Sequence, residues 1–230
     1  VFVDVVALVQ ALPAWDSDTA AESIKVLPGG SALNQARHLH GLGLGVTFFG
    51  SLGDDSLGDM LSRHVREQGF PMENVKVFPG LPSSVCLVLS GRADRAFVSC
   101  YATTDALVTR DLEEREAALE GCCHFHVGGY FNMKGLMNSE FTALLRRCKA
   151  KGMTISLNTQ WDADGVWLGK GGHLREVLPL VDVLFVNEVE AQKLAAALRG
   201  ADVAPLSLCE AFPELTVVMT KGKAGCDILR

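Results

Sequence analysis

Short apolar runs alternate along the chain with longer segments in which apolar residues follow a helical period. The apolar runs are rich in β-branched residues and predict strands at residues 1–8, 46–52, 122–127, 153–158, 182–186 and 215–220. The periodic segments predict helices at residues 32–42, 56–69, 134–151, 188–198 and 206–212. This alternation is typical of an α/β fold with a mostly parallel central sheet flanked by helices.

One region breaks the alternation. The segments 84–89 and 95–101 both have strand character, and the polar residues between them predict an antiparallel hairpin. With the extended piece 23–27, the hairpin predicts a small sheet that stands off the main layer. This sheet is either a β lid over a ligand site or an edge extension of the core. No repeat or linker divides the chain, so we expect one α/β domain over residues 1–230.

Composition and charge narrow the range of partners. The chain has 230 residues, of which 48% are hydrophobic, enough for one substantial core. Its 27 acidic and 21 basic residues give a formal net charge of −6, which argues against nucleic acid and anionic membranes as partners. A small phosphorylated ligand remains compatible, because backbone N–H groups and helix N-termini bind phosphate without a net positive charge.

The cysteines and the first residues indicate the compartment. Seven cysteines form no CxxC pair, and an odd number argues against a fully paired disulfide scaffold. The apolar residues 1–9 are interrupted by Asp4, have no basic leader and are too few to span a bilayer. We therefore expect a cytoplasmic protein with reduced thiols.

Paired glycines precede the first predicted helix. Gly29 and Gly30 allow the backbone to approach a ligand closely, and the helix that follows offers unpaired N–H groups. Ser31 is a candidate N-cap, and Asn34 in the first turn can donate to and accept from a hydroxyl. A tight turn with a capping asparagine is the alternative interpretation.

The order of several motifs makes the pattern specific. In sequence, these are Gly29-Gly30-x-x-x-Asn34-x-Ala36, Leu42-Gly43, Phe49-Gly50-Ser51-Leu52-Gly53-Asp54-Asp55-x-x-Gly58, Gln68-Gly69, Asn187-Glu188-x-Glu190 and Thr220-Lys221-Gly222-x-x-Gly225. Together they resemble the ribokinase and phosphofructokinase-B family of carbohydrate kinases almost from end to end. The resemblance implies a ribokinase-like fold and ATP-dependent phosphorylation of a sugar or sugar-like hydroxyl.

The resemblance also implies roles for individual residues. The sugar would be bound by Asp4, Gly29, Gly30, Asn34 and Tyr130. We expect Asp4 at the carboxyl end of the first strand, where open α/β sheets bind ligands, and a carboxylate there accepts from adjacent hydroxyls. The resemblance assigns the nucleotide to Asn187, Thr220, Gly222 and Gly225. It assigns Mg²⁺ to Glu190, through water, in keeping with a hard cation that keeps part of its hydration shell.

Each assignment has a structural alternative. Asp4 could cap a turn, and Tyr130 could pack in the core. Asn187 and Glu190 could form an N-terminal helix cap, and Thr220 to Gly225 could be a plain hairpin turn. His124 and His126 alternate on an apolar strand without further metal ligands and favour packing over a zinc site. Asn158 stands where many members of the family carry Asp, which puts a charge-dependent contact there in doubt.

The expected catalytic base is not among these residues. In the family the base is the Asp of a Gly-Ala-Gly-Asp loop, which does not occur in the 230 residues, so we expect it beyond Arg230. Either the chain is a piece of a longer kinase, or it is a form that binds sugar or a protein partner with negligible turnover.

A nicotinamide-dependent enzyme is the alternative class. Gly41-Leu42-Gly43-Leu44-Gly45 follows a helix and precedes a strand, the reverse of the arrangement that cradles a pyrophosphate. The sequence does not separate ribose, fructose, a keto-deoxy sugar acid or a nucleoside as substrate. A homodimer through exposed lid edges is a further expectation.

Overall fold

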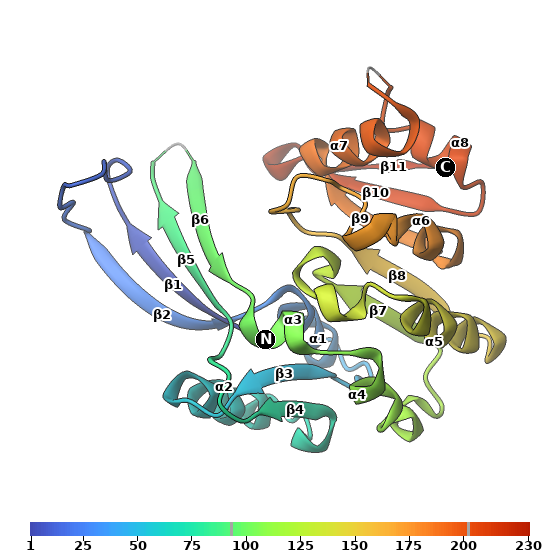
Figure 1. Ribbon diagram of the computed structural model, residues 1–230, viewed down its shortest axis with the longest axis horizontal. Coiled ribbons are helices and arrows are strands. Elements are labelled where there is room, and N and C mark those ends of the chain that lie inside the picture. Colours follow the sequence, from blue (N-terminus) through green and yellow to red (C-terminus); the bar gives the residue numbers. More distant parts are fainter. Residues whose placement is uncertain (93, 202) are drawn as a thin grey trace. The chain divides into compact units, whose positions relative to one another are not determined.

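A computed structural model describes residues 1–92, 94–201 and 203–230 (Figure 1). The chain divides into two compact units, Val1–Thr104 and Asp105–Arg230. The prediction of a single domain over the whole chain stays a prediction.

The first unit contains two sheets. Its strands are β1 (Phe2–Leu8), β2 (Ser23–Gly29), β3 (Gly50–Gly53), β4 (Val75–Phe78), β5 (Val85–Ser90) and β6 (Arg95–Cys100). Its helices are α1 (Ser31–Gly41) and α2 (Ser56–Glu67), and α3 (Ala102–Ala106) begins at its end. Four strands form what we call the small sheet, in the order β2-β1-β5-β6, and β3 pairs with β4 in a two-stranded parallel sheet.

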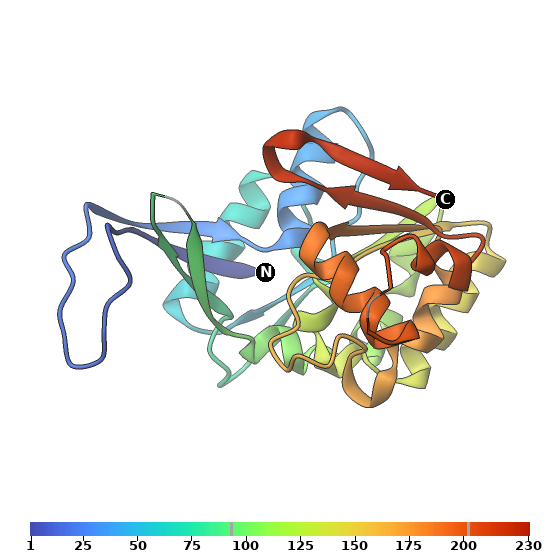
Figure 2. The ribbon, with the colours of Figure 1, turned by 90° about the horizontal axis from the view of Figure 1, so that it is seen from above.

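The small sheet confirms the hairpin and the extended piece at 23–27, but it also contains β1, which the sequence pattern had assigned to the main layer. β1 pairs antiparallel with β2 from Phe2 to Leu8 and parallel with β5 from Val3 to Leu8. Periodicity identifies the buried face of a strand but not its neighbours, which explains the error. Figure 2 shows the loop that joins β1 to β2 extending beyond both strands (blue).

The core of the first unit lies where helices cover these strands. Its buried members are Val3, Leu33, Ala36, Phe48, Leu52, Leu61, Val65, Phe70 and Val75. Leu61 and Val65 lie one turn apart on α2 and are fully buried, as an amphipathic helix requires. The segment 46–52 was predicted as one strand, whereas β3 begins only at Gly50, and the pairing strand β4 was missed.

The second unit has a single five-stranded sheet in the order β11-β10-β9-β8-β7. The strands are β7 (His124–Gly128), β8 (Thr154–Asn158), β9 (Val183–Asn187), β10 (Thr216–Thr220) and β11 (Cys226–Leu229). The first four are parallel and β11 is an antiparallel edge, so the α/β fold with a mostly parallel central sheet is confirmed. Figure 2 shows β10 and β11 as a hairpin (red).

Helices accompany the parallel strands of this unit. They are α4 (Thr109–Glu113), α5 (Ser139–Ala150), α6 (Leu174–Val177), α7 (Glu188–Arg199) and α8 (Ser207–Ala211). Short 3₁₀ turns occur in the two units at Met72–Asn74, Glu116–Leu119, Tyr130–Asn132, Lys134–Leu136, Lys170–Gly172, Leu178–Leu180 and Gly222–Ala224. The core residues with no exposed surface include Leu144, Leu145, Ile155, Leu157, Leu174, Val177, Leu178, Leu184, Leu194 and Val217.

Helix starts differ from the sequence expectations at two places. Gly30, not Ser31, is the N-cap of α1, and Ser31 is the first helical residue. The helix expected from residue 134 begins at Ser139, because the Asn138 side chain accepts a 3.0 Å hydrogen bond from the backbone N–H of Phe141 and caps the helix there.

Candidate functional site

The residues assigned to ligand binding fall into two groups, one in each unit. Asp4, Gly29, Gly30 and Asn34 belong to the first unit, and Tyr130, Asn187, Glu190, Thr220, Gly222 and Gly225 belong to the second.

Asp4 lies against Gly29 within the small sheet. A Cβ atom placed on Gly29 would lie 2.0 Å from Oδ2 of Asp4, so a side chain here would displace the carboxylate from its present position. Asp4 is the third residue of β1 rather than a residue at its carboxyl end, as the sequence analysis expected, because strand pairing continues on both sides to Leu8. The side chain therefore projects from the face of the small sheet.

The carboxylate of Asp4 is partly removed from water without a compensating donor. Burial raises its pKa above the usual range for Asp. No group within residues 1–92, 94–201 and 203–230 donates a hydrogen bond to it. A half-buried acceptor without a donor is unfavourable in the free protein, and hydroxyl groups of a ligand would relieve it.

Gly30 and Asn34 follow Gly29 directly. Gly30 adopts φ +103°, a left-handed conformation that side chains disfavour, and a Cβ there would lie 3.2 Å from the backbone nitrogen of Phe2. The carbonyl of Gly30 accepts the N–H of Asn34 at 3.0 Å, which forms the first turn of α1. The Asn34 side chain is exposed on that turn. The diglycine bend thus places Asp4, Gly29 and the start of α1 together.

Strand ends in the second unit meet at one edge of its sheet. Gly128 of β7 is in register with Asn158 of β8, and Asn187 of β9 with Thr220 of β10. The carboxyl ends of parallel strands are the usual ligand-binding edge of an open α/β sheet. The predicted nucleotide residues therefore share one edge.

Asn187 and Glu190 form a reciprocal helix cap. The Asn187 side chain accepts from the N–H of Glu190 at 2.9 Å, and Oε2 of Glu190 accepts from the N–H of Asn187 at 3.1 Å. Burial raises the pKa of Glu190, whose residue is 7% exposed. The structural alternative raised by the sequence is therefore present, and among the described residues Oε1 of Glu190 has no hydrogen-bond partner.

A directly coordinated metal ion would need more ligands than Glu190. Among the described residues, no group of three or more His, Cys, Asp or Glu side chains could hold one. One carboxylate oxygen at the start of a helix fits Mg²⁺ held through water and nucleotide phosphates, which is how this cation is commonly bound.

The segment from Thr220 to Gly225 is the turn of the β10–β11 hairpin. Its ends are joined by a 2.8 Å bond from the N–H of Lys221 to the carbonyl of Gly225. Gly222 and Gly225 adopt positive φ, +56° and +91°, and a Cβ on either would meet no atom within 4 Å. The backbone of this turn is open to a ligand, while the ammonium of Lys221 lies 3.0 Å from Asp227.

Tyr130 packs in the core of the second unit, which is the structural alternative to a role in sugar binding. It has no exposed surface, and its hydroxyl lies 2.7 Å from Nδ1 of His173, whose Nε2 lies 2.8 Å from Oγ1 of Thr142. The Tyr130 ring also stacks on the His173 ring. This enclosure favours the packing alternative for Tyr130, and its assignment to the sugar stays a prediction.

Asn158 and the alternating histidines are held by neighbours. Asn158 donates to the carbonyl of Phe185 at 3.0 Å and accepts from Gln160 at 2.9 Å. Both ring nitrogens of His124 lie 2.7 Å from the hydroxyls of Thr154 and Ser156, and Nδ1 of His126 also lies 2.7 Å from Ser156. These contacts agree with packing.

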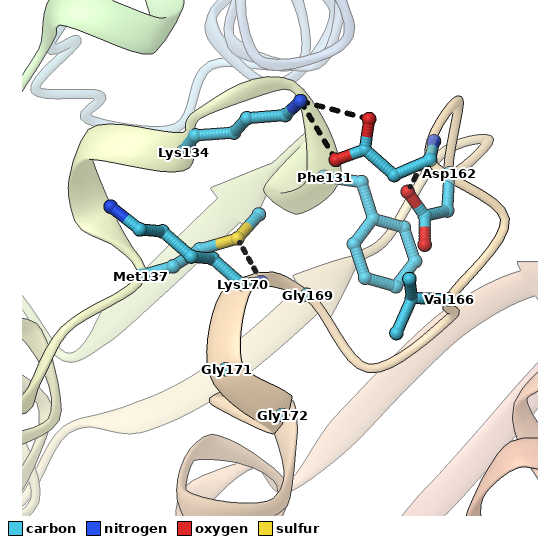
Figure 3. Close-up of a pocket in the computed structure, with 10 residues that line it drawn as sticks. Phe131, Lys134, Met137, Asp162, Val166, Gly169, Lys170, Gly171 and Gly172 are labelled. Carbon is cyan, nitrogen blue, oxygen red and sulfur yellow. Dashed lines mark hydrogen bonds and ion pairs between the residues drawn. The ribbon is translucent and has the colours of Figure 1, made fainter.

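A cavity of about 240 Å³ lies between the segments that follow β7 and β8 (Figure 3). Its wall includes Phe131, Met137 and Val166, together with the charged residues Lys134, Asp162, Asp164 and Lys170. The ammonium of Lys134 lies 2.8 Å from Asp164, and buried Asp162 accepts the N–H groups of Asp164 and Trp167. With two lysines and two aspartates, the lining carries no formal net charge.

Comparison with known proteins decides the family. The family model described as pfkB family carbohydrate kinase matches residues 1–230. The chain belongs to the pfkB family of carbohydrate kinases. The resemblance inferred from the motifs is thereby confirmed.

Relatives within the pfkB family are distant in sequence. An ATP-dependent ribose-1-phosphate kinase of Halopiger xanaduensis is 27% identical over 232 residues, covering 98% of this chain and 70% of the relative. Fructokinase-1 of Zea mays is 26% identical over 204 residues, covering 86% of this chain and 62% of the relative. The chain thus spans roughly two thirds of the length of these pfkB proteins.

Solved structures show the same fold. A ribokinase from Giardia lamblia matches with a TM-score of 0.77 at 21% identity, covering 99% of this chain and 69% of the other. An Anopheles gambiae adenosine kinase matches with a TM-score of 0.75 at 20% identity, covering 99% and 80%. The ribokinase-like fold of this pfkB chain is thereby confirmed.

The helices of this pfkB chain were compared with the length and hydropathy of membrane-spanning helices. In the ranges that the structure describes, no helix combines the length and hydropathy needed to cross a bilayer.

Proposed function

We propose that this chain supplies the sugar-binding residues and part of the nucleotide-binding residues of an ATP-dependent kinase that phosphorylates a hydroxyl of a sugar or sugar-like substrate, with Mg²⁺. Membership of the pfkB family supports the reaction class. The observation that carries the proposal is the Asp4 carboxylate, partly buried against Gly29 and lacking a donor.

The substrate side follows from the geometry of the first unit. Asp4 accepts hydrogen bonds from hydroxyls of the substrate, and Asn34 both donates and accepts nearby on α1. Gly29 and Gly30 keep the backbone free of side chains at this point. Fixing a hydroxyl in this way contributes to phosphoryl transfer by positioning, because little covalent chemistry is required of the protein.

The nucleotide side follows from the strand ends of the second unit. We assign contacts with the nucleotide to the hydroxyl of Thr220 and to the backbone at Gly222 and Gly225, where a Cβ atom would meet no neighbouring atom. Asn187 and Glu190 occupy the start of α7, where the helix dipole favours phosphate. When bound, Mg²⁺ neutralises charge on the transferred phosphoryl group, and Glu190 would hold it through water.

A second candidate function is ligand binding without turnover. The Gly-Ala-Gly-Asp loop that carries the base in this family is absent from the 230 residues. A base and an anion hole each contribute orders of magnitude in rate. We therefore expect the 230-residue chain to bind sugar and nucleotide but to release ADP at a negligible rate.

Two measurements test the proposal. Thermal shift of the chain with D-ribose, D-fructose, adenosine and the magnesium complex of ATP should rise for at least one hydroxyl ligand, and Asp4→Ala and Asn34→Ala should each reduce that rise. A ligand-induced shift unchanged in both variants would remove these residues from the site. A coupled ADP-release assay distinguishes the two functions, because clear turnover would eliminate the binding-only form.

The remaining expectations are a homodimer and a cytoplasmic location. Ile24 and Val26 on β2, an edge strand of the small sheet, are 65% and 49% exposed, which supports association through this edge. Sedimentation of the chain against an Ile24→Lys variant tests the dimer. The location stays a prediction.

A further inference from the structure

A row of polar side chains runs over three strands of the small sheet, β1, β5 and β6, and on β2 the position opposite Asp4 is Leu27. Strand register places Asp4 opposite Cys86 on β5, and Cys86 opposite Ser99 on β6. Directly opposite residues on paired strands project from the same face. The three side chains therefore lie side by side on one face.

Contacts along the row agree with this placement. The hydroxyl of Ser99 donates to Sγ of Cys86 at 3.3 Å. Burial, and in addition the charge of Asp4, raise the pKa of Cys86, which the Ser99 bond only partly offsets. The thiol is thus neutral at physiological pH, half-buried, and next to the carboxylate of Asp4.

Apolar and aromatic side chains border the row on both sides. Phe2 and Tyr101 lie two residues from Asp4 and Ser99 on the same face, and their rings meet edge to face with centroids 5.9 Å apart. On the other side, Val6, Val88 and Phe97 form the corresponding row. A polar row between apolar borders matches a polyol, whose hydroxyls and C–H groups alternate.

We propose that Asp4, Cys86 and Ser99 form one surface that binds neutral hydroxyls of the substrate, and that Cys86 and Ser99 decide which polyol is accepted. This inference rests on the proposed function and deepens it. A partly desolvated carboxylate repels a carboxylate or phosphate brought to the same place. Any anionic group of the substrate is therefore bound elsewhere, while Ser99 can donate to and accept from a hydroxyl.

The test measures affinity of the 230-residue chain by calorimetry. The probes are D-ribose, D-fructose and adenosine, with D-gluconate as the anionic comparison. We expect at least one neutral probe to bind more tightly than gluconate. Ser99→Ala should weaken that binding about two- to tenfold, the loss of one hydrogen bond. Cys86→Met, which extends into the row, should weaken it at least about tenfold, whereas Cys86→Ser should stay within about threefold.

Cys100 offers a matched control on the same hairpin. It is opposite Val85, one register step from Ser99, so its side chain projects from the other face, where it is exposed. Cys100→Met should leave the affinity unchanged. Circular dichroism of all variants checks that each is folded.

The outcomes separate the inference from the proposed function. If Asp4→Ala abolishes binding while the Cys86 and Ser99 variants bind like the parent, Cys86 and Ser99 do not contact the substrate. The inference then fails and the proposed function stands. The inference also fails if Cys100→Met loses as much affinity as Cys86→Met, or if the parent binds gluconate more tightly than the neutral probes. If the parent binds no neutral probe, the proposed function fails and the row with it.

Discussion

Asp4 combines an unfavourable environment with the absence of a donor. Its folded-state pKa is raised by burial, so the ionised form destabilises the folded state at pH values above the folded pKa. Below the pKa that Asp4 has in the unfolded chain, the group is protonated in both states and this destabilisation is absent. As the pH rises through the higher pKa of the folded state, the folded protein loses this stability. This is the sign expected of a carboxylate retained for binding rather than for stability.

Asp4→Asn should therefore raise the melting temperature at pH 7, with the gain shrinking as the pH falls through the carboxylic acid range. Thermal unfolding followed by circular dichroism from pH 3 to pH 7 measures it. The same variant should lose polyol affinity, because the amide replaces one acceptor oxygen with a donor. A melting temperature lowered at pH 7 would contradict the assigned role of burial.

Tyr130 belongs to a different category of residue. Its hydroxyl satisfies Nδ1 of His173 inside the second unit, and His173 in turn satisfies Thr142. Tyr130→Phe keeps the ring but leaves a buried imidazole nitrogen without its partner.

We expect Tyr130→Phe to lower the free energy of unfolding by about 1–3 kcal/mol, measured by urea denaturation. Tyr101→Phe is a control for loss of a phenol hydroxyl, since the ring of Tyr101 contacts Phe2 and its hydroxyl has no hydrogen bond in the described ranges. Equal effects of the two substitutions would show that the His173 contact does not stabilise the unit.

At the scale of elements, the residues at which the β5–β6 hairpin begins and ends, Ser83, Ser84 and Thr103, form its root and make several side-chain hydrogen bonds. Asp55 caps α2 through the N–H of Gly58 at 2.7 Å and also accepts the N–H and hydroxyl of Ser83 at 2.9 and 2.7 Å. Ser84 lies 3.1 Å from the hydroxyl of Thr103, where the chain leaves the hairpin. These bonds hold the start of β5 against the start of α2 and against Thr103. The N–H of Val3 donates to the carbonyl of Ser84 at 2.9 Å, which ties the same point to β1.

Asp55→Ala removes the cap and both bonds to Ser83. We expect it to reduce the free energy of unfolding by about 2–4 kcal/mol, combining the usual cost of a lost N-cap with that of buried unpaired groups. Hydrogen exchange of the β5 and β6 amides should rise with it.

Asp54→Ala is the adjacent control. Asp54 accepts only the exposed N–H of Gly80, at 2.9 Å, and so should cost no more than about 1 kcal/mol. If hydrogen exchange of the β5 and β6 amides is unchanged in Asp55→Ala, the bonds of Asp55 do not stabilise the hairpin.

At the scale of the whole molecule, the protein is built without covalent cross-links. All seven cysteines are free thiols in the structure, and two of them, Cys148 and Cys209, are buried. Stability therefore comes from the two cores and their hydrogen bonds rather than from disulfides.

The melting temperature should accordingly be the same with and without millimolar dithiothreitol, as measured by differential scanning calorimetry. Titration of the unfolded chain with Ellman's reagent should report all seven thiols. A drop in melting temperature on reduction would indicate a disulfide that the structure does not contain.

Much of the architecture was predictable because it is encoded locally. The bounds of β7, β8 and α7 lie within two residues of the predicted ones, since apolar periodicity and the Asn187 cap are local signals. Strand partners were not predictable in this way, and β1 was assigned to the wrong sheet for that reason.

The sequence by itself determined the family, strands β7 to β10 and helices α5, α7 and α8 of the second unit, and the glycines that the motifs require. Only the tertiary structure decided that Asp4 lies mid-strand beside Cys86, that Tyr130 is enclosed and that Asp55 holds the hairpin root. Periodicity and motifs report what a residue needs from its own segment. Register, burial and hydrogen-bond partners depend on segments tens of residues away, which come together only when the chain packs.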